Sequence, residues 1–301
     1  MITNFDQMFE QLRSKPKKRL VAAWGVDDHT ISAVYMAVEA GIVEGMLVGD
    51  EAMIQKVCAD NNYDINKLTV INNPNELKSI AQAVDMVNAG EADILMKGLC
   101  STDKYMRGIL NKEKGLLPPK AVLSHVCVVQ NPGYHKLLVI SDIAVIPAPD
   151  LKQKQAMIGY VANTARALGV EKPKVAMITA TEQMLPGMPA CVEAAMLAKM
   201  SDRGQIAGCV VDGPLALDVA LCKEAAEIKK LKSEVAGDAD CCVFPSIEAA
   251  NVFYKFAGHF CPGVKMAAMV AGAKAPCVLS SRADSTETKL NSIALAALTA
   301  K

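Results

Sequence analysis

The sequence lacks the features that mark several large classes of protein. Lysine plus arginine and aspartate plus glutamate both total 32, so no net charge attracts nucleic acid or an anionic membrane surface. No segment reaches the roughly 20 apolar residues that span a bilayer. The polar N-terminus has no apolar stretch before its basic cluster, which argues against a signal peptide. We therefore expect a cytoplasmic protein without nucleic-acid or membrane partners.

Motifs of common metal and nucleotide sites are also missing. The ten cysteines form no C-x-x-C pair, which favours reduced thiols over disulfides or zinc. There is no Walker A loop, no G-x-G-x-x-G, no H-E-x-x-H and no G-x-S-x-G. The four histidines have no metal-ligand spacing. We expect no metal and no bound cofactor, while a cysteine nucleophile stays open because no cysteine is singled out by a histidine partner in the sequence.

Short β-rich runs alternate with longer amphipathic segments, as in the expected strand 19–26 and the expected helix 29–41. This alternation predicts an α/β fold with parallel-rich sheets flanked by helices. The runs 121–130 and 136–146 follow each other directly, and the residues 131–133 (Asn-Pro-Gly) predict a hairpin between them. Later helices are expected at 151–168, 188–200, 218–230, 248–257 and 285–299.

The chain length of 301 residues suggests two domains, at roughly 150 residues per domain. Pro147 and Pro149 break the chain after its first half, and we place a domain crossing there. The last strand and helix are expected to return to the first domain. The predicted domains are therefore 1–146 plus 269–301, and 147–268.

One candidate site is the turn that holds Lys97, Gly98, Ser101, Thr102 and Arg107. In parallel sheets, ligands bind beyond the carboxyl ends of the strands. The glycine permits a tight turn, and either hydroxyl residue can cap the helix that follows. Free N–H groups at that helix start attract an anion, and the two cations could neutralise a phosphate. The alternative is a capped helix with two solvated cations.

A second candidate site follows the strand near the C-terminus and contains Ser281, Arg282, Asp284 and Glu287. A guanidinium suits phosphate oxygens or a thioester carbonyl that develops negative charge. Either carboxylate could serve as a base. The residues alone are explained equally by a serine-capped helix with acids placed to suit its dipole.

Two further strand exits carry polar residues. Asp212 could hold a loop that faces the substrate, and Asp218 could cap a helix beginning at about Val219. A turn and a helix cap without further function explain this segment equally well. Glu248 and Asn251 could reach a substrate, but a helix start accounts for them too.

At these loops the chain resembles the phosphate acetyl- and butyryltransferase family over nearly its whole length. The match is carried, in the family's order, by LMKGLCSTDKYMRGIL, PGYHKLLVISDIAVIPAPD, VDGPLALDVA, FPSIEAANVFYK and GAKAPCVLSSRADSTETKLNSIALA. The resemblance implies a fold like isocitrate and isopropylmalate dehydrogenases, with the active site in the cleft between two domains, and a homodimer or higher oligomer. It also implies exchange of coenzyme A and inorganic phosphate on an acyl group, both as substrates. The MKG loop, the SRADSTETKL ending and the length are similar to the butyryl branch.

The resemblance also assigns roles to residues. Ser281 and Arg282 match the pair at the family's reaction centre, and Arg107 matches an arginine that helps to hold the anionic substrate. His259 stands where the acetyl branch has another arginine. That branch carries its catalytic aspartate where this chain has a threonine, so the base is either Glu287 or Asp284. Alternatives are acetyl rather than butanoyl transfer, a nicotinamide-dependent dehydrogenase of the same fold, and a non-catalytic acyl-CoA-binding protein.

Overall fold

The computed structural model describes residues 1–280 and 284–301. The chain packs into two compact units. The first unit comprises Phe5–Leu123 and Ala267–Lys301, and the second comprises Met1–Asn4 and Ser124–Met266. The units group 124–146 with the middle of the chain, whereas the sequence-based division placed that segment in the other domain. The division into domains, with a site in a cleft, stays a prediction.

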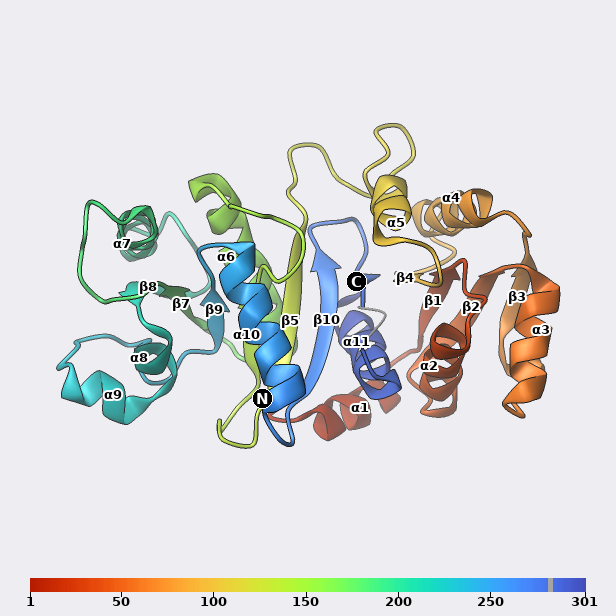
Figure 1. The fold of residues 1–301 in the computed structure, drawn as a ribbon, viewed down its shortest axis with the longest axis horizontal. Helices are drawn as coiled ribbons and strands as arrows, with labels where there is room; N and C mark the ends of the chain where they lie inside the picture. The colour runs from red at the N-terminus through yellow and green to blue at the C-terminus, as the bar shows by residue number, and fades with distance from the viewer. Residues whose placement is uncertain (281–283) are drawn as a thin grey trace. The chain divides into compact units, whose positions relative to one another are not determined.

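The first unit is a parallel-rich sheet with helices on both faces, as the alternation predicts (Figure 1). Its strands are ordered β3-β2-β1-β4-β11-β10. α11 packs on α2 and α1, while α4 packs on α5. Its elements are α1 (Phe5–Arg13), β1 (Lys18–Ala23), α2 (Asp28–Glu39), β2 (Val43–Gly49), α3 (Glu51–Asp60), η1 (Ile65–Lys67), β3 (Thr69–Asn72), α4 (Glu76–Asn88), β4 (Ile94–Lys97), α5 (Thr102–Ile109), β10 (Lys265–Ala271, whose first two residues belong to the second unit), β11 (Cys277–Val278) and α11 (Thr286–Thr299).

The second unit has strands ordered β5-β6-β9-β7-β8. β5 and β6 pair antiparallel, which confirms the predicted hairpin, and β6, β9, β7 and β8 are parallel. Its elements are β5 (Ser124–Gln130), β6 (Leu138–Ser141), α6 (Leu151–Ala167), β7 (Lys174–Ile178), α7 (Pro189–Asp202), β8 (Val210–Leu215), α8 (Leu217–Leu221), α9 (Lys223–Ile228), β9 (Cys241–Val243) and α10 (Ile247–Phe260). The predicted α/β fold class is confirmed.

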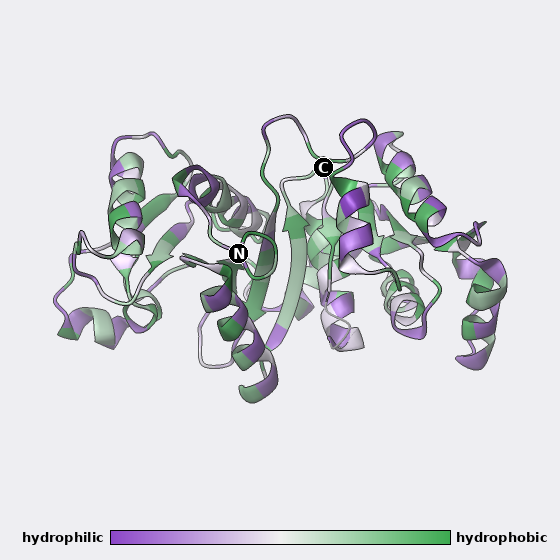
Figure 2. Ribbon diagram, turned by 45° about the horizontal axis from the view of Figure 1, so that its top comes forward, coloured by the Kyte–Doolittle hydropathy of each residue, from purple (hydrophilic) through white to green (hydrophobic). Residues whose placement is uncertain are grey.

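Hydrophobic residues gather in the strands, where Figure 2 shows mostly green ribbon, while the helices carry both colours. The central strand β4 is buried at every residue, and so are most positions of β1 and β10. Burial of a parallel strand on both faces removes the alternation seen in half-exposed strands. The core therefore lies along the sheet, and polar side chains are left to the turns at the strand ends.

Two predicted elements differ from the structure. The expected strand 136–146 ends at Ser141, because the buried Asp142 carboxylate accepts hydrogen bonds from the backbone N–H groups of residues 144, 145 and 146 and folds them into a turn. The expected helix 218–230 is two helices, because Cys222 is extended, with φ −112° and ψ 116°. The prediction was therefore wrong at these two places.

An ion-pair cluster ties together the amino ends of β6, β7 and β9 in the second unit. The buried Lys136 ammonium lies 2.8 Å from Asp238 and 2.7 Å from Asp240. Lys174 lies 2.6 Å from Asp238. Burial alone would raise the pKa of Asp238, but hydrogen bonds from the two lysines outweigh it and hold that pKa well below its usual range. Proton uptake by Asp238 is therefore coupled to unfolding.

Candidate functional site

The first candidate turn connects β4 to α5. Lys97 is the last residue of β4 and is only 8% exposed, and its Nζ lies 3.2 Å from the Gly98 carbonyl oxygen. Ser101 caps α5, since its Oγ accepts a hydrogen bond from the backbone N–H of Lys104. Thr102 is the exposed first residue of the helix. A buried ammonium thus lies beside a helix start, two features that favour an anion.

Arg107 lies on the last turn of α5 with its side chain 79% exposed. Its Nε is 3.1 Å from a carboxylate oxygen of Asp103, one turn earlier. An exposed pair of this kind holds its partners weakly. The guanidinium could therefore leave Asp103 for a stronger anion.

The second candidate turn connects β11 to α11. Ser281 and Arg282 lie outside the described residues. Beyond them, Ser285 caps α11 and accepts a hydrogen bond from the backbone N–H of Thr288. The buried Lys289 Nζ donates to the Asp284 carbonyl oxygen at 2.6 Å. Asp284 is half-buried and Glu287 is exposed on the first turn of the helix. The two candidate bases thus occupy different surroundings.

The strands that precede these two turns lie side by side within the first unit. β4 and β11 are neighbouring parallel strands, with Leu95 opposite Cys277 and Met96 opposite Val278. The carboxyl ends of the two strands therefore lie next to each other at the same end of the sheet. The buried Tyr105 hydroxyl lies 3.2 Å from the Leu95 carbonyl oxygen and 3.3 Å from that of Val278, which ties α5 to both strands.

A third turn, between β1 and α2, was missed by the sequence reasoning. The Gly98 N–H donates to the Ala23 carbonyl oxygen at 3.0 Å, and the Leu99 N–H donates to that of Trp24 at 2.9 Å. Asp27 caps α2 through Oδ2, which accepts a hydrogen bond from Thr30 N–H. Its buried Oδ1 has no hydrogen-bond partner among residues 1–280 and 284–301. Nothing in the linear order of residues indicates that this turn contacts the Lys97 turn.

The remaining predicted residues lie in the second unit. Asp212 is half-buried in β8, and its Oδ1 accepts a hydrogen bond from Gly213 N–H at 2.8 Å. His259 is exposed near the end of α10. The expected cap by Asp218 was wrong, because α8 begins at Leu217 and has no side-chain cap. Asn251 supports the backbone, since its Nδ2 donates to the Ile143 carbonyl oxygen.

Thiols at the edge of the first unit do not suit nucleophilic catalysis. Cys100 lies two residues after Gly98 and is buried, and burial raises the pKa of its thiol. Cys277 lies in β11, where burial raises the thiol pKa to about 12. A thiol is nucleophilic only as the thiolate. Two of the open cysteine candidates are therefore disfavoured by their surroundings.

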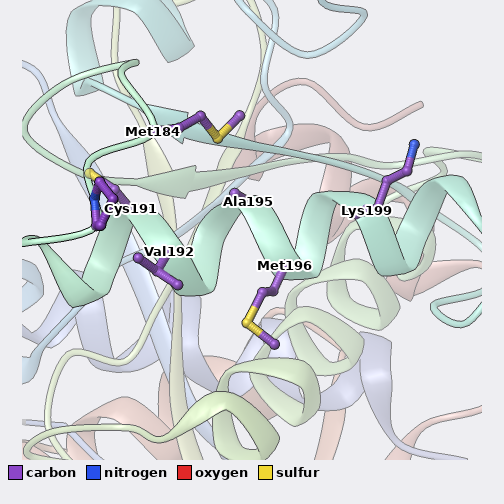
Figure 3. Close-up of a pocket in the computed structure, with 7 residues that line it drawn as sticks. Met184, Cys191, Val192, Ala195, Met196 and Lys199 are labelled. Atoms are coloured by element: carbon purple, nitrogen blue, oxygen red, sulfur yellow. The ribbon is translucent and has the colours of Figure 1, made fainter.

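An apolar pocket of about 460 Å³ lies on α7 of the second unit. Figure 3 shows that its labelled side chains come from α7 and the loop before it. The lining residues are Met184, Pro186, Cys191, Val192, Ala195, Met196 and Lys199. One lysine among apolar groups provides too few donors for a reacting phosphate. Among the described residues no group of three or more His, Cys, Asp or Glu could hold a metal, and no helix there is long and apolar enough to cross a membrane.

Comparisons with known proteins agree on one family. A family model described as phosphate acetyl/butaryl transferase matches residues 74–297. A phosphate butyryltransferase of Clostridium acetobutylicum is 45% identical over 300 residues, covering 100% of this chain and 99% of that protein. The crystal structure of a branched-chain phosphotransacylase from Enterococcus faecalis V583 has a TM-score of 0.82 at 28% identity, covering 94% of this chain and 98% of that one.

The dehydrogenase-like fold class is also confirmed. The crystal structure of a 4-hydroxythreonine-4-phosphate dehydrogenase from Klebsiella pneumoniae covers 95% of this chain and 100% of that one, with a TM-score of 0.56. At 13% identity this likeness concerns the fold alone.

Proposed function

Since this chain belongs to the phosphate acetyl- and butyryltransferase family, we propose that it exchanges coenzyme A and inorganic phosphate on a short acyl group, with butanoyl-CoA as the substrate. The resemblance stated from the sequence is thereby confirmed. The observation that supports the reaction is the parallel pairing of β4 with β11, because the Lys97 turn follows one strand and Ser281 and Arg282 follow the other in the sequence. We place the reaction at this edge of the first unit.

In one direction a phosphate oxygen attacks the thioester carbonyl carbon. A C–O bond forms, the C–S bond breaks, and the sulfur leaves as a thiolate that takes up a proton. Lys97 and Arg107 orient the phosphate, and Gly98, Ser101 and Thr102 offer it a helix start. Arg282 stabilises the oxyanion that develops on the carbonyl oxygen, and Ser281 donates to that oxygen or to the sulfur.

In the other direction the coenzyme A thiol attacks acyl phosphate. A thiol has a pKa of about 8.5, so its proton must be removed at neutral pH. A carboxylate within hydrogen-bond reach would supply about 10²–10⁴-fold in rate. Asp284 and Glu287 are the two candidates, two and five residues after Arg282 in the sequence. On the family resemblance alone, we also propose Asp212 and His259 as substrate-binding residues.

The acyl group, the location and the oligomeric state are also proposed. The relatives named above differ in the acyl group of their names, butyryl in one and branched-chain in the other. We propose butanoyl transfer, without a bound cofactor, in a cytoplasmic homodimer or higher oligomer. Acetyl transfer is the alternative, and a series of acyl-CoA substrates separates the two.

A thiol-release assay tests the proposed function. Butanoyl-CoA should release free thiol only when inorganic phosphate is present, and butanoyl phosphate should accumulate with the same time course. Arg282→Ala should lose most of kcat, while the matched variant Arg203→Ala, at an exposed arginine after α7, should retain it. Absence of phosphate-dependent thiol release from the wild-type protein would exclude the function.

A further inference from the structure

Trp24 is the only tryptophan of the chain and has an unusual backbone. It follows β1 directly, with φ at 55°, in the left-handed region. Bulky residues seldom occupy this region, since their side chains crowd the backbone there. Such conformations persist where the surroundings hold them, and they cluster at functional sites.

The Lys97 turn is what holds Trp24. The Trp24 carbonyl oxygen accepts a hydrogen bond from Leu99 N–H at 2.9 Å. The carbonyl carbon of Trp24 lies 2.5 Å from the place where a Cβ on Gly98 would be. Only a glycine at position 98 allows this approach. The Trp24 backbone and the proposed phosphate turn are therefore joined by a hydrogen bond and close packing.

The Trp24 indole stacks on no other aromatic ring of the described residues. It is half-buried, and in the described part of the chain it makes no hydrogen bond, ring stacking or cation–π contact. A tryptophan in a protein interior usually finds a partner for its N–H. Part of Trp24 therefore stays exposed at the end of the sheet where β1 and β4 finish, and its indole N–H has no partner among the described residues.

We propose that the Trp24 indole is a wall of the acyl site and sets the length of the acyl chain that the protein accepts. This inference rests on the proposed function. The reacting acyl carbon must lie within about 3–3.5 Å of the phosphate oxygen. Phosphate held by the Lys97 turn therefore places the acyl chain, rather than the distant adenine of coenzyme A, beside the residue bonded to that turn.

Two substitutions at Trp24 test whether its indole limits the length of the acyl chain. Trp24→Gly removes the indole and suits the positive φ, so it should fold; Trp24→Phe keeps an aromatic face. A hydrophobic pocket discriminates one methylene by about 10–200-fold. We expect Trp24→Gly to raise the ratio of kcat/KM for hexanoyl-CoA over butanoyl-CoA by about tenfold or more, and Trp24→Phe to raise this ratio less.

Fluorescence provides a second readout that does not depend on turnover. Because Trp24 is the single tryptophan, its emission reports this position alone. Butanoyl-CoA without phosphate should shift or quench it, and free coenzyme A, which lacks the acyl chain, should do so less.

The outcomes separate this inference from the proposed function. No thiol release by the wild type would defeat the function. Normal release with an unchanged chain-length profile in Trp24→Gly would overturn the role of Trp24. If that variant did not fold, equal emission changes with butanoyl-CoA and free coenzyme A would overturn it instead.

Discussion

Replacement of Gly98 by alanine should damage the site through the backbone. A Cβ at this position would lie 2.7 Å from the Ala23 carbonyl oxygen and closer still to the Trp24 carbonyl group. Backbone atoms cannot rotate away as a flexible side chain would, so the turn must move. That movement strains the Gly98-to-Ala23 and Leu99-to-Trp24 hydrogen bonds.

The loss of stability in Gly98→Ala can be worked out from these contacts. Two hydrogen bonds contribute about 1 kcal/mol each, and overpacking costs about 1–3 kcal/mol. The free energy of unfolding should therefore fall by about 3–5 kcal/mol. Displacement of a substrate-positioning turn by 1 Å can cost about 10²-fold in rate, so kcat/KM should fall with the stability.

Urea unfolding and the thiol-release assay measure the two effects. The matched control is Gly159→Ala, in the middle of α6, where an added Cβ meets nothing within 4 Å. Alanine is the better helix former by about 0.5–1 kcal/mol, so this variant should be at least as stable as the wild type. A wild-type unfolding midpoint for Gly98→Ala would refute the proposed packing of the turn.

Three more predictions concern charged residues. Arg107→Ala should raise the KM for phosphate without moving the unfolding midpoint, because its side chain is exposed and only loosely paired with Asp103; an unchanged KM would remove it from the phosphate site. Glu287→Gln and Asp284→Asn should differ sharply in the pH profile of kcat/KM, and equal, small effects would mean that neither is the base. Asp238→Asn should unfold earlier in urea at neutral pH. The lowered pKa of Asp238 stabilises the fold above its unfolded value of about 3.9 and is lost as pH falls through the folded value, so the deficit should shrink in acid; a deficit independent of pH would contradict this linkage.

Sequence reasoning predicted the long helices best. The last helix, expected at 285–299, is Thr286–Thr299, and the helix expected at 151–168 is Leu151–Ala167. α1 was missed although Phe5, Met8 and Leu12, all buried, repeat at helical spacing. The polar composition of the N-terminus obscured that signal.

The site was predictable in part. The Lys97 turn and the segment around Arg282 could be proposed from the sequence because each comes between an expected strand and an expected helix, and their roles stay a prediction. That β4 and β11 are neighbours depends on long-range pairing, which local pattern does not reveal. The contact between Trp24 and Leu99 joins residues far apart in the chain, so the β1–α2 turn had no signal in the linear sequence.

A double-mutant cycle between Lys97 and Arg282 measures whether the two turns serve one reaction. Lys97→Met keeps most of the buried aliphatic stem and removes the charge. If both cations act on the same phosphate and transition state, the losses in kcat/KM of Lys97→Met and Arg282→Ala should couple by about 1 kcal/mol or more in the double variant. Losses that add to within about 0.5 kcal/mol would show that the two residues act independently.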